Sequence, residues 1–300
     1  MLDLSVIILT KDEELHIARC LDNISPIAKE VFIIDSFSTD KTLEIASRYT
    51  NVQIMQNQWT THARQFNWAL ENAPIKTQWV LRLDADEYLT EELKQELKDR
   101  LPYFDGNITG GIFPLRRVFL GRIIRRGMNP IKLLRLFRFG KAKSEVRFMD
   151  EHINLIDGCA VDFVNEFADD NLNNLSWWTK KHIGYAIREA VDLLDIEYNL
   201  TGSAVRDNNL GISKQAKKKR LAKHKYAKQP LFWRSFAYFI YRYFLRMGFL
   251  EGKEGFLWHF LQGWWYRTLV DAKIYEIKRK CGNDPDRIRL LLRSEYSISI

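Results

Sequence analysis

Clusters of carboxylates follow apolar segments in the first part of this chain of 300 residues. The sharpest cluster is Asp84-Ala85-Asp86, directly after the apolar run 79–83. If that run is a strand, Asp84 and Asp86 leave it on the same face, because side chains alternate along a strand. Two carboxylates so placed suit Mg²⁺ or Mn²⁺, hard cations that prefer oxygen ligands and often share them with phosphates. The alternative is a solvated strand end beside a helix N-terminus, where acids are favoured anyway.

Further acids and hydroxyls follow two earlier apolar segments, 4–9 and 31–34. In an open α/β sheet, ligands bind at the carboxyl ends of the strands, so these groups would share one edge with the later carboxylate pair. No glycine-rich dinucleotide fingerprint and no P-loop pattern is present, so neither kind of nucleotide site is supported. The residues concerned are Thr10, Lys11, Asp12 and Glu13 after the first segment, and Asp35, Ser36, Ser38 and Asp40 after the second.

The elements that must position these residues alternate between apolar strands and amphipathic helices. Such alternation predicts βαβ units and a Rossmann-like, mixed but mostly parallel sheet. Helical periodicity is weak from about 108 to 165, which we interpret as strands and long loops, before a helix over 177–199. The predicted strands are 4–9, 31–34, 52–55 and 79–83, the predicted helices are 15–24, 41–49, 63–72 and 91–101, and the later extended segments are 112–119, 132–139 and 159–164.

Composition places the chain among globular proteins, with 46% hydrophobic and 28% charged residues. A net charge of +8 favours an anionic partner, and since no nucleic-acid-binding motif is present we expect a phosphorylated substrate or an acidic membrane surface. Three widely spaced cysteines exclude a disulfide scaffold and fit a reducing compartment. The N-terminal apolar run is too short for a signal peptide, and no uncharged apolar stretch reaches the roughly 18 residues of a spanning helix.

The segment from 213 onward is basic and then rich in aromatic residues. Residues 214–228 hold about eight Lys or Arg and no acid, and 231–250 is almost entirely apolar except for three arginines in one helical sector, Arg234, Arg242 and Arg246. Such a stretch forms either a pair of core helices or an interfacial helix with aromatic rings at headgroup depth and cations on anionic lipid. We predict binding to an anionic membrane surface, with insertion of Phe232, Trp233, Trp258, Trp264 and Trp265.

Several stretches resemble the family 2 glycosyltransferases, which are inverting enzymes with the GT-A fold. The specific ones are SVIILTKDEE (5–14), VFIIDSFSTDKT (31–42), HARQFNWAL (62–70) and VLRLDADEYL (80–89). Looser matches are similar to bacterial lipopolysaccharide-core β-glucosyltransferases and their cell-envelope relatives: FLGRIIRRG (119–127), LLRLFRFGKA (133–142) and RMGFLEGKEGFLWHFLQ (246–262). The resulting prediction is a GT-A catalytic domain over 1–212, with a nucleotide-sugar half over 1–105 and an acceptor half over 106–212, followed by membrane-associating helices over 213–300.

The resemblance implies a UDP-sugar donor and roles for single residues of its site. Asp35 matches the acid that hydrogen-bonds the uracil ring, and Arg64 matches a basic residue near uracil or phosphate. Thr10, with Glu13 or Glu14, matches the first nucleotide-binding loop. The family often has two adjacent acids after the second strand, whereas here Ser36 follows Asp35, so only one acid remains.

The same resemblance assigns the carboxylate pair to a metal. Asp84 and Asp86 match the DxD motif that holds Mg²⁺ or Mn²⁺, with Asp86 the more direct ligand. Closer relatives have a His shortly before the helix near 177 that could help hold the metal. This chain has Asp169-Asp170 there, which leaves the third protein ligand open.

Inverting sugar transfer needs a base that takes the proton of the acceptor hydroxyl. Alignment with the family places this acid within Met149-Asp150-Glu151-His152, with Glu151 as the base and Asp150 as the second candidate. The alternative is a surface turn with an Asp–Arg contact. A nearby group of arginines would bind phosphate on donor or acceptor, or else form the polar face of strands and a loop. The members of this group that we single out are Arg116, Arg126 and Arg135.

Together these observations predict an inverting, metal-dependent glycosyltransferase. It would move a sugar from a UDP-sugar, with UDP-glucose as one candidate, to a membrane-linked glycolipid or lipopolysaccharide-type acceptor at the cytoplasmic face of the bacterial inner membrane. A nucleotidyltransferase is the enzyme alternative, although residues 9–14 lack the Gly-rich basic loop such enzymes carry. The non-enzymatic alternative is a basic membrane scaffold, but such a scaffold does not explain why acidic residues follow three of the predicted strands.

Overall fold

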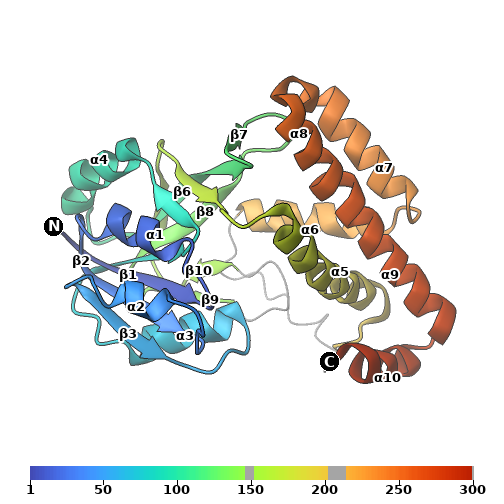
Figure 1. The fold of residues 1–300 in the computed structure, drawn as a ribbon, viewed down its shortest axis with the longest axis horizontal. Coiled ribbons are helices and arrows are strands. Elements are labelled where there is room, and N and C mark those ends of the chain that lie inside the picture. Colours follow the sequence, from blue (N-terminus) through green and yellow to red (C-terminus); the bar gives the residue numbers. More distant parts are fainter. Residues whose placement is uncertain (146–151, 202–213, 299–300) are drawn as a thin grey trace. The chain divides into compact units, whose positions relative to one another are not determined.

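The computed structural model describes residues 1–145, 152–201 and 214–298, with the side chains of 214–220 outside the description. The chain forms two compact units (Figure 1). The sheet unit comprises residues 1–125 and 129–172, and the helical unit comprises residues 126–128 and 173–300. We predicted a boundary near residue 212, whereas the structure puts helix α5 (Leu175–Tyr198) with the C-terminal helices. The reason is packing, because Val191 and Leu194 of α5 share a core with Ile274.

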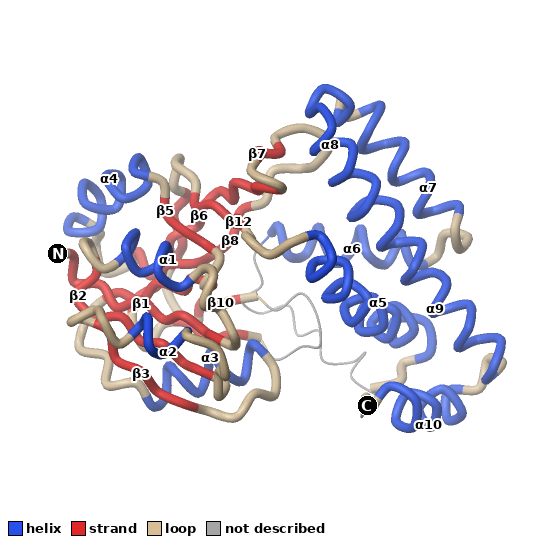
Figure 2. Tube along the Cα trace, viewed as in Figure 1, coloured by secondary structure: helices blue, strands red, loops and turns tan. Residues whose placement is uncertain are grey.

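The sheet unit is built around one mixed sheet with strand order β3-β2-β1-β4-β8-β6-β12-β5, and β7 and β11 pair with β6. Strands β1 to β4 pair in parallel with one another, while β8 runs antiparallel to both β4 and β6. Strands β9 and β10 form a separate ladder. The strands, red in Figure 2, are β1 (Leu2–Thr10), β2 (Ala28–Asp35), β3 (Val52–Gln56), β4 (Trp79–Asp84), β5 (Glu87–Leu89), β6 (Ile108–Phe119), β7 (Arg122–Ile124), β8 (Lys132–Arg138), β9 (Ala142–Ser144), β10 (Ile153–Leu155), β11 (Cys159–Asp162) and β12 (Phe167–Asp170).

Helices cover both faces of the sheet, and successive residues of the central strands belong to opposite faces. Val6 and Ile8 of β1 share a core with residues of α1 and α4, whereas Ile7 shares a second core with residues of α3. A strand that is buried on both faces reads as a continuous apolar run, which is why the sequence predicted these strands. The helices of this unit are α1 (Ile17–Ile24), α2 (Thr42–Ala46), α3 (His62–Asn72) and α4 (Glu91–Arg100), with a 3₁₀ turn η1 (Leu101–Tyr103).

The helical unit has its own core, formed mainly between α5 and α9. None of the helices in the described part of the chain is long and apolar enough to cross a bilayer. Two short π-helical segments, η2 and η4, interrupt the α-helices. Besides α5, the elements are α6 (Lys214–Ala227), α7 (Trp233–Ile240), η2 (Tyr241–Leu245), η3 (Gly248–Glu251), α8 (Gly252–Trp258), η4 (His259–Trp265), α9 (Tyr266–Cys281) and α10 (Pro285–Tyr296).

The loop 126–128 is held within the helical unit by the segment that begins RMGFLEG. Gly127 N donates a hydrogen bond to the carbonyl of Arg246 at 3.1 Å. A Cβ on Gly127 would lie 2.1 Å from Cε1 of the buried His259, and φ at Gly127 is +77°, so the position requires glycine. The segment 246–262, one of the looser matches to the family, therefore has a structural role, because it fixes the loop 126–128.

The aromatic residues of the helical unit divide between core and surface. Trp258 is 6% exposed, and its Nε1 donates to the Sδ of Met128 at 3.2 Å. Trp264 stacks on Phe239 with ring centroids 5.3 Å apart. The prediction that Trp258 inserts into a membrane is wrong, because the core of the unit encloses it. Trp233, by contrast, is 72% exposed.

Candidate active site

Three of the predicted site residues lie at the carboxyl ends of three adjacent strands. In the ladder of β1 and β2, Thr10 pairs with Asp35, and in the ladder of β1 and β4, Leu9 pairs with Asp84. Asp35 and Asp84 therefore lie on either side of the end of β1, within one residue of register. Parallel strands joined by crossover helices end at the same edge, which is why residues so distant in sequence meet here.

The Asp84-Ala85-Asp86 turn connects β4 to the short strand β5. Ala85 is buried, whereas the side chains of Asp84 and Asp86 are partly exposed at the edge. Asp84 Oδ2 lies 3.6 Å from Nη2 of Arg135, and Asp86 Oδ2 accepts a hydrogen bond from Nδ2 of Asn171 at 2.9 Å. One carboxylate is thus held by a residue of β8 and the other by the residue that follows β12, and both stay partly exposed.

Glu87, the first residue of β5, fixes the conformation of this turn. Its Oε2 accepts a hydrogen bond from Asp84 N at 2.9 Å, and its Oε1 accepts one from Nη2 of Arg135 at 2.5 Å. Burial raises the pKa of Glu87 well above its ordinary value, although the charge of Arg135 acts in the opposite direction. The sequence analysis assigned Glu87 no role, and its only signal was its place directly after the carboxylate pair.

Strand β12 brings a third carboxylate, that of Asp169, next to the turn. Asp169 pairs with Glu87 in the ladder of β12 and β5, and Nη1 of Arg117 donates to its Oδ2. Burial raises the pKa of Asp169, and the charges of Asp86 and Asp84 raise it further against the opposing effect of Arg117. A cation bound next to these carboxylates would favour their charged forms.

These carboxylates fit a divalent cation whose remaining ligands come from the substrate of the protein and from water. Among the side chains that the structure describes, no group of three His, Cys, Asp or Glu residues is arranged to hold an ion by itself. Mg²⁺ commonly uses one or two carboxylates and completes its shell with water and phosphate oxygens. Asp84 and Asp86 supply such a pair, and the predicted third protein ligand stays open.

The carboxylate of Asp35 is fully buried and accepts four hydrogen bonds from the chain. Oδ1 accepts from the hydroxyls of Thr10 and Ser38, at 3.0 and 2.5 Å. Oδ2 accepts from the backbone N of Ser38 at 2.8 Å and from Nε2 of Gln56 at 3.3 Å. Since a carboxylate offers about four lone-pair sites, a nucleobase N–H could bind Asp35 only by replacing one of these donors. The bond from Gln56 is the longest and therefore the weakest of the four.

The predicted nucleotide loop after β1 is tied to the loop that follows β2. Glu13 N donates to Oγ1 of Thr42 at 2.7 Å, and Oε2 of Glu14 accepts from the backbone N of Lys41 at 3.1 Å. The two loops hence form one connected edge that includes Thr10. The structure brings these residues together, and their contacts with a nucleotide stay a prediction.

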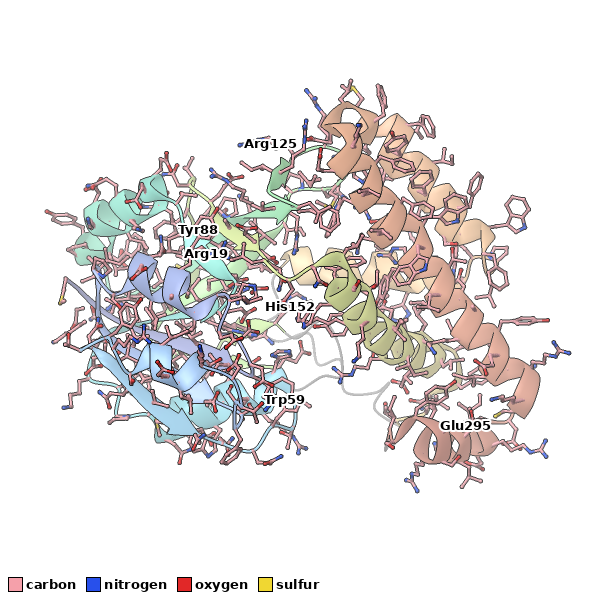
Figure 3. All side chains as sticks on the ribbon, in the orientation of Figure 1. Arg19, Trp59, Tyr88, Arg125, His152 and Glu295 are labelled. Carbon is pink, nitrogen blue, oxygen red and sulfur yellow. The ribbon has the colours of Figure 1, made fainter. Side chains whose placement is uncertain are left out.

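Two residues that the sequence analysis missed, one just before α1 and one within it, connect this edge to the end of β12. The guanidinium of Arg19 donates to the carboxylate of Asp170 at 2.7 Å and to the carbonyl of Asp86 at 3.2 Å. Arg19 also lies over the ring of Tyr88, 5.2 Å from its centroid. Both residues are labelled side by side in Figure 3. His16 is buried, and its Nε2 accepts a hydrogen bond from Leu172 N. No local pattern indicated these roles, because the partners that connect the two side chains to the end of β12 lie about 150 residues away.

The predicted arginines occupy different environments. Arg64 is exposed in the first turn of α3 and forms no ion pair with any described residue. Arg116 forms an ion pair with Glu166 at 2.8 Å. Arg126 belongs to the loop 126–128, and its backbone N donates to Oε1 of Glu251 at 2.7 Å. Arg135 is buried between Glu87 and Asp84, so it neutralises the turn from within the sheet.

The two candidates for the catalytic base, Asp150 and Glu151, lie outside the described residues. The adjoining strand β10 begins at Ile153, and its residue Ile153 pairs with Ser144 of β9. Their assignment as base stays a prediction.

The mixed, mostly parallel sheet with helices on both faces fits a GT-A fold, and the comparison with known proteins agrees. The family model for glycosyl transferase family 2 matches residues 5–161, just over half of the chain. The chain belongs to this family and is a glycosyltransferase.

Individual relatives extend this comparison. An uncharacterized glycosyltransferase of Rickettsia typhi is 27% identical over 293 residues, covering 94% of this chain and 90% of the relative. The lipopolysaccharide core biosynthesis glycosyltransferase LpsC of Rhizobium meliloti is 30% identical over 154 residues, covering 48% of this chain and 54% of LpsC. Among solved structures, residues 1–349 of TarS from S. aureus, in complex with UDP-GlcNAc, give 16% identity and a TM-score of 0.45, with 93% of this chain and 92% of that one covered. At this level the likeness to TarS assigns no ligand.

Proposed function

We propose that this glycosyltransferase moves a sugar from a UDP-sugar to a lipid-linked, lipopolysaccharide-type acceptor, with inversion and with the help of Mg²⁺ or Mn²⁺. The observation that carries the proposal is the placement of Asp35 and Asp84 on either side of the end of β1, with Asp86 in the next turn. An acid after the second strand suits a nucleobase, and a carboxylate pair after the fourth suits a cation on a diphosphate. Together they fit a nucleoside-diphosphate donor.

In the proposed reaction the acceptor oxygen attacks the anomeric carbon of the sugar as the bond from that carbon to the diphosphate breaks. Glu151, or else Asp150, takes the proton of the acceptor hydroxyl, and both electrons of the broken bond leave with UDP. When bound, the cation would offset the charge that develops on the diphosphate. Asp84 and Asp86 would hold this cation, while Glu87 keeps their turn in one conformation.

The proposed acceptor class rests on two observations. LpsC, which is similar to about half of this chain, is named for lipopolysaccharide core biosynthesis. The helical unit also exposes many large apolar side chains. A lipid-linked acceptor is presented at a membrane surface, so we propose a peripheral location on the cytoplasmic face of the bacterial inner membrane.

A donor screen by calorimetry tests the proposal. We expect UDP-sugars to bind more tightly than GDP-, dTDP- and CMP-sugars, and Mn²⁺ or Mg²⁺ to increase their affinity. Equal affinity for all four nucleotides, or an affinity that ignores the metal, would contradict the donor or the metal assignment respectively.

The variant Asp86→Ala tests the cation site directly. It should abolish sugar transfer and remove the metal-dependent part of UDP binding, while circular dichroism and thermal unfolding stay as in the wild type. Asp99→Ala is a matched control, because Asp99 lies on α4 and accepts a hydrogen bond only from the nearby Gln95 among the contacts described for it. Near-normal turnover of Asp86→Ala would overturn the cation site.

A further inference from the structure

The helix that opens the aromatic segment buries mostly polar side chains, with Phe239 among them, and exposes large apolar ones. In α7 and η2 the buried residues include Arg234, Ser235 and Arg242, with exposed fractions of 5%, 0% and 1%. The residues on the outside are large and apolar. They are Trp233, Phe236, Tyr241, Phe244 and Leu245, and the first and last of them are 72% and 73% exposed. The arginine sector that the sequence predicted exists, but it faces the protein interior, so Arg234 and Arg242 are not available to lipid.

Specific partners fix this orientation. Nε and Nη2 of Arg234 donate to Oδ1 of Asp271 on α9, at 2.8 and 2.6 Å, and Asp271 is fully buried. Nη1 of Arg242 donates to Oε1 of Gln262 on η4. A buried charge is tolerated only when it is paired and hydrogen-bonded. Turning the helix over would expose these pairs and bury the aromatic side, so the pairing holds the apolar side outward.

The apolar surface continues beyond the helix. Phe249 on η3 is 47% exposed, and its ring lies against Tyr243 of η2 with centroids 6.4 Å apart. Soluble proteins rarely expose a contiguous apolar patch of this kind, and such patches mark sites of interaction. We name this surface the outer face, and it consists of Trp233, Phe236, Tyr241, Phe244, Leu245 and Phe249.

The basic segment that precedes the outer face in the sequence indicates what this face binds. Helix α6, directly before α7, has the sequence KQAKKKRLAKHKYA, with seven Lys or Arg and no acid. Lys225 and Lys228, at its end and just beyond, are exposed. Cations beside exposed Trp, Tyr and Phe match the headgroup region of an anionic bilayer, where the rings lie at the interface and the cations lie on phosphate. A second copy of this chain would bring the same basic segment against itself, which is unfavourable.

We propose that the outer face inserts into the headgroup region of an anionic membrane and that α6 supplies the salt-sensitive part of the attraction. This inference deepens the peripheral location given above and rests on it. It leaves out Trp258, which is buried, and relies on the side chains that the structure leaves outside. Because no spanning helix is found among the described residues, the unit would lie on the membrane surface.

Sedimentation with vesicles tests this surface on the full-length protein. The probes are phosphatidylcholine vesicles with and without about one third phosphatidylglycerol, over a salt series. The double variant Trp233→Ser/Leu245→Ser changes two side chains that are almost free of packing, so the fold should be kept. We expect its binding to anionic vesicles at high salt to fall about tenfold or more, since apolar burial is insensitive to salt. The matched control Leu290→Ser alters a residue of α10 that is 66% exposed, and it should bind like the wild type.

Tryptophan fluorescence tests whether Trp233 itself contacts the lipid. Brominated lipids should quench the tryptophan emission of the wild type, and Trp233→Phe should lose a measurable part of that quenching, because Trp233 is 72% exposed whereas Trp258 is 6% exposed. Unchanged vesicle binding in the double variant would overturn the outer face as the membrane contact. A wild-type dimer in analytical ultracentrifugation that the double variant abolishes, with vesicle binding unchanged, would assign the face to a second copy instead.

The experiment is independent of sugar transfer. Calorimetry with a UDP-sugar in the absence of vesicles should give the same affinity for the wild type and the double variant, because the donor site lies in the sheet unit. Loss of vesicle binding with intact donor binding would support the outer face, and failed donor binding in the wild type would count against the proposed function alone.

Discussion

Nε2 of His16 accepts a hydrogen bond from the backbone N of Leu172 at 2.9 Å, although the two residues are 156 positions apart. On the other side of the ring, Nδ1 lies 2.6 Å from Oε2 of Glu13. Because Nε2 accepts, the ring proton must be on Nδ1, which donates it to Glu13. A single buried side chain thus joins the predicted nucleotide loop after β1 to the segment that follows Asp169 on β12.

Replacing His16 should loosen both segments. His16→Ala leaves the N–H of Leu172 and the carboxylate of Glu13 without this partner, which should lower the free energy of unfolding by roughly 1–3 kcal/mol. We also expect weaker UDP-sugar binding, because the loop that carries Thr10 and Glu13 loses a fixed point. Urea unfolding and calorimetry measure the two effects, with the exposed neighbour variant Leu15→Ala as control. Unchanged donor affinity in His16→Ala would limit His16 to a purely structural role.

The four hydrogen bonds of Asp35 make its predicted role in donor binding testable against a scaffolding role. Asp35→Ala should weaken UDP binding by roughly 1.5–3 kcal/mol, with or without metal. If the nucleobase replaces the 3.3 Å bond from Gln56, then Gln56→Ala should leave the UDP affinity unchanged or increase it. A loss in Gln56→Ala as large as that in Asp35→Ala would mean that Asp35 acts through the loop network instead.

The catalytic base can be tested by two isosteric changes. Glu151→Gln should keep the UDP-sugar affinity and reduce the transfer rate by about 10²–10⁴, the usual scale of general-base catalysis. Asp150→Asn should reduce the rate less. Single-turnover transfer measurements on both variants compare them directly, and a reversed order would assign the base to Asp150.

The sheet and its acidic edge could be predicted because their signals are local. Strands such as β1 are buried on both faces, so their residues form continuous apolar runs, and parallel topology then brings Thr10, Asp35 and Asp84 to one edge. The family was predicted from the resemblance of short motifs, and the comparison with known proteins confirmed it.

The remaining features depend on partners far away in the sequence. No local pattern indicates that Glu87 receives Arg135, which lies 48 residues further on. Similarly, the side of α7 that faces inward is decided by Asp271, 37 residues beyond Arg234, so periodicity gave the two sectors of the helix but not their direction. The boundary of the helical unit was misplaced for the same reason, since α5 is recognisable as part of it only through its packing against α9.

The fit of loop 126–128 against the helical unit predicts a strong steric effect at one glycine. Gly127 and Gly121 share a φ of +77°, but a Cβ on Gly127 would meet His259 at 2.1 Å, whereas a Cβ on Gly121 meets nothing within 4 Å. Gly127→Ala should therefore destabilise the protein by at least about 2 kcal/mol more than Gly121→Ala, because overpacking adds to the same backbone strain. Thermal unfolding of the two variants gives the difference, and equal losses would show that the loop moves away easily.

His259 should make the stability of the helical unit depend on pH. Its ring is fully buried, and neither ring nitrogen has a hydrogen-bond partner among the described residues. Burial, together with the positive charge of Arg242, lowers the pKa of His259 to about 4 from its ordinary value of 6.5. Above pH 6.5 the ring is neutral in both the folded and the unfolded chain, so this group adds no pH dependence there. Between about pH 6.5 and pH 4 the unfolded chain binds a proton that the folded chain does not.

The free energy of unfolding should therefore fall as the pH falls through this window, by up to about 1.4 kcal/mol per pH unit from this residue. Six of the nine tryptophans belong to the helical unit, so tryptophan emission during urea unfolding at pH 7, 6 and 5 reports mainly on it. His259→Phe removes the titrating group and should flatten the slope, even if the larger ring changes the absolute stability. His259→Gln, neutral at every pH, should flatten it equally. A slope that both variants retain would mean that other groups cause the acid sensitivity and that His259 becomes protonated without cost in the folded protein.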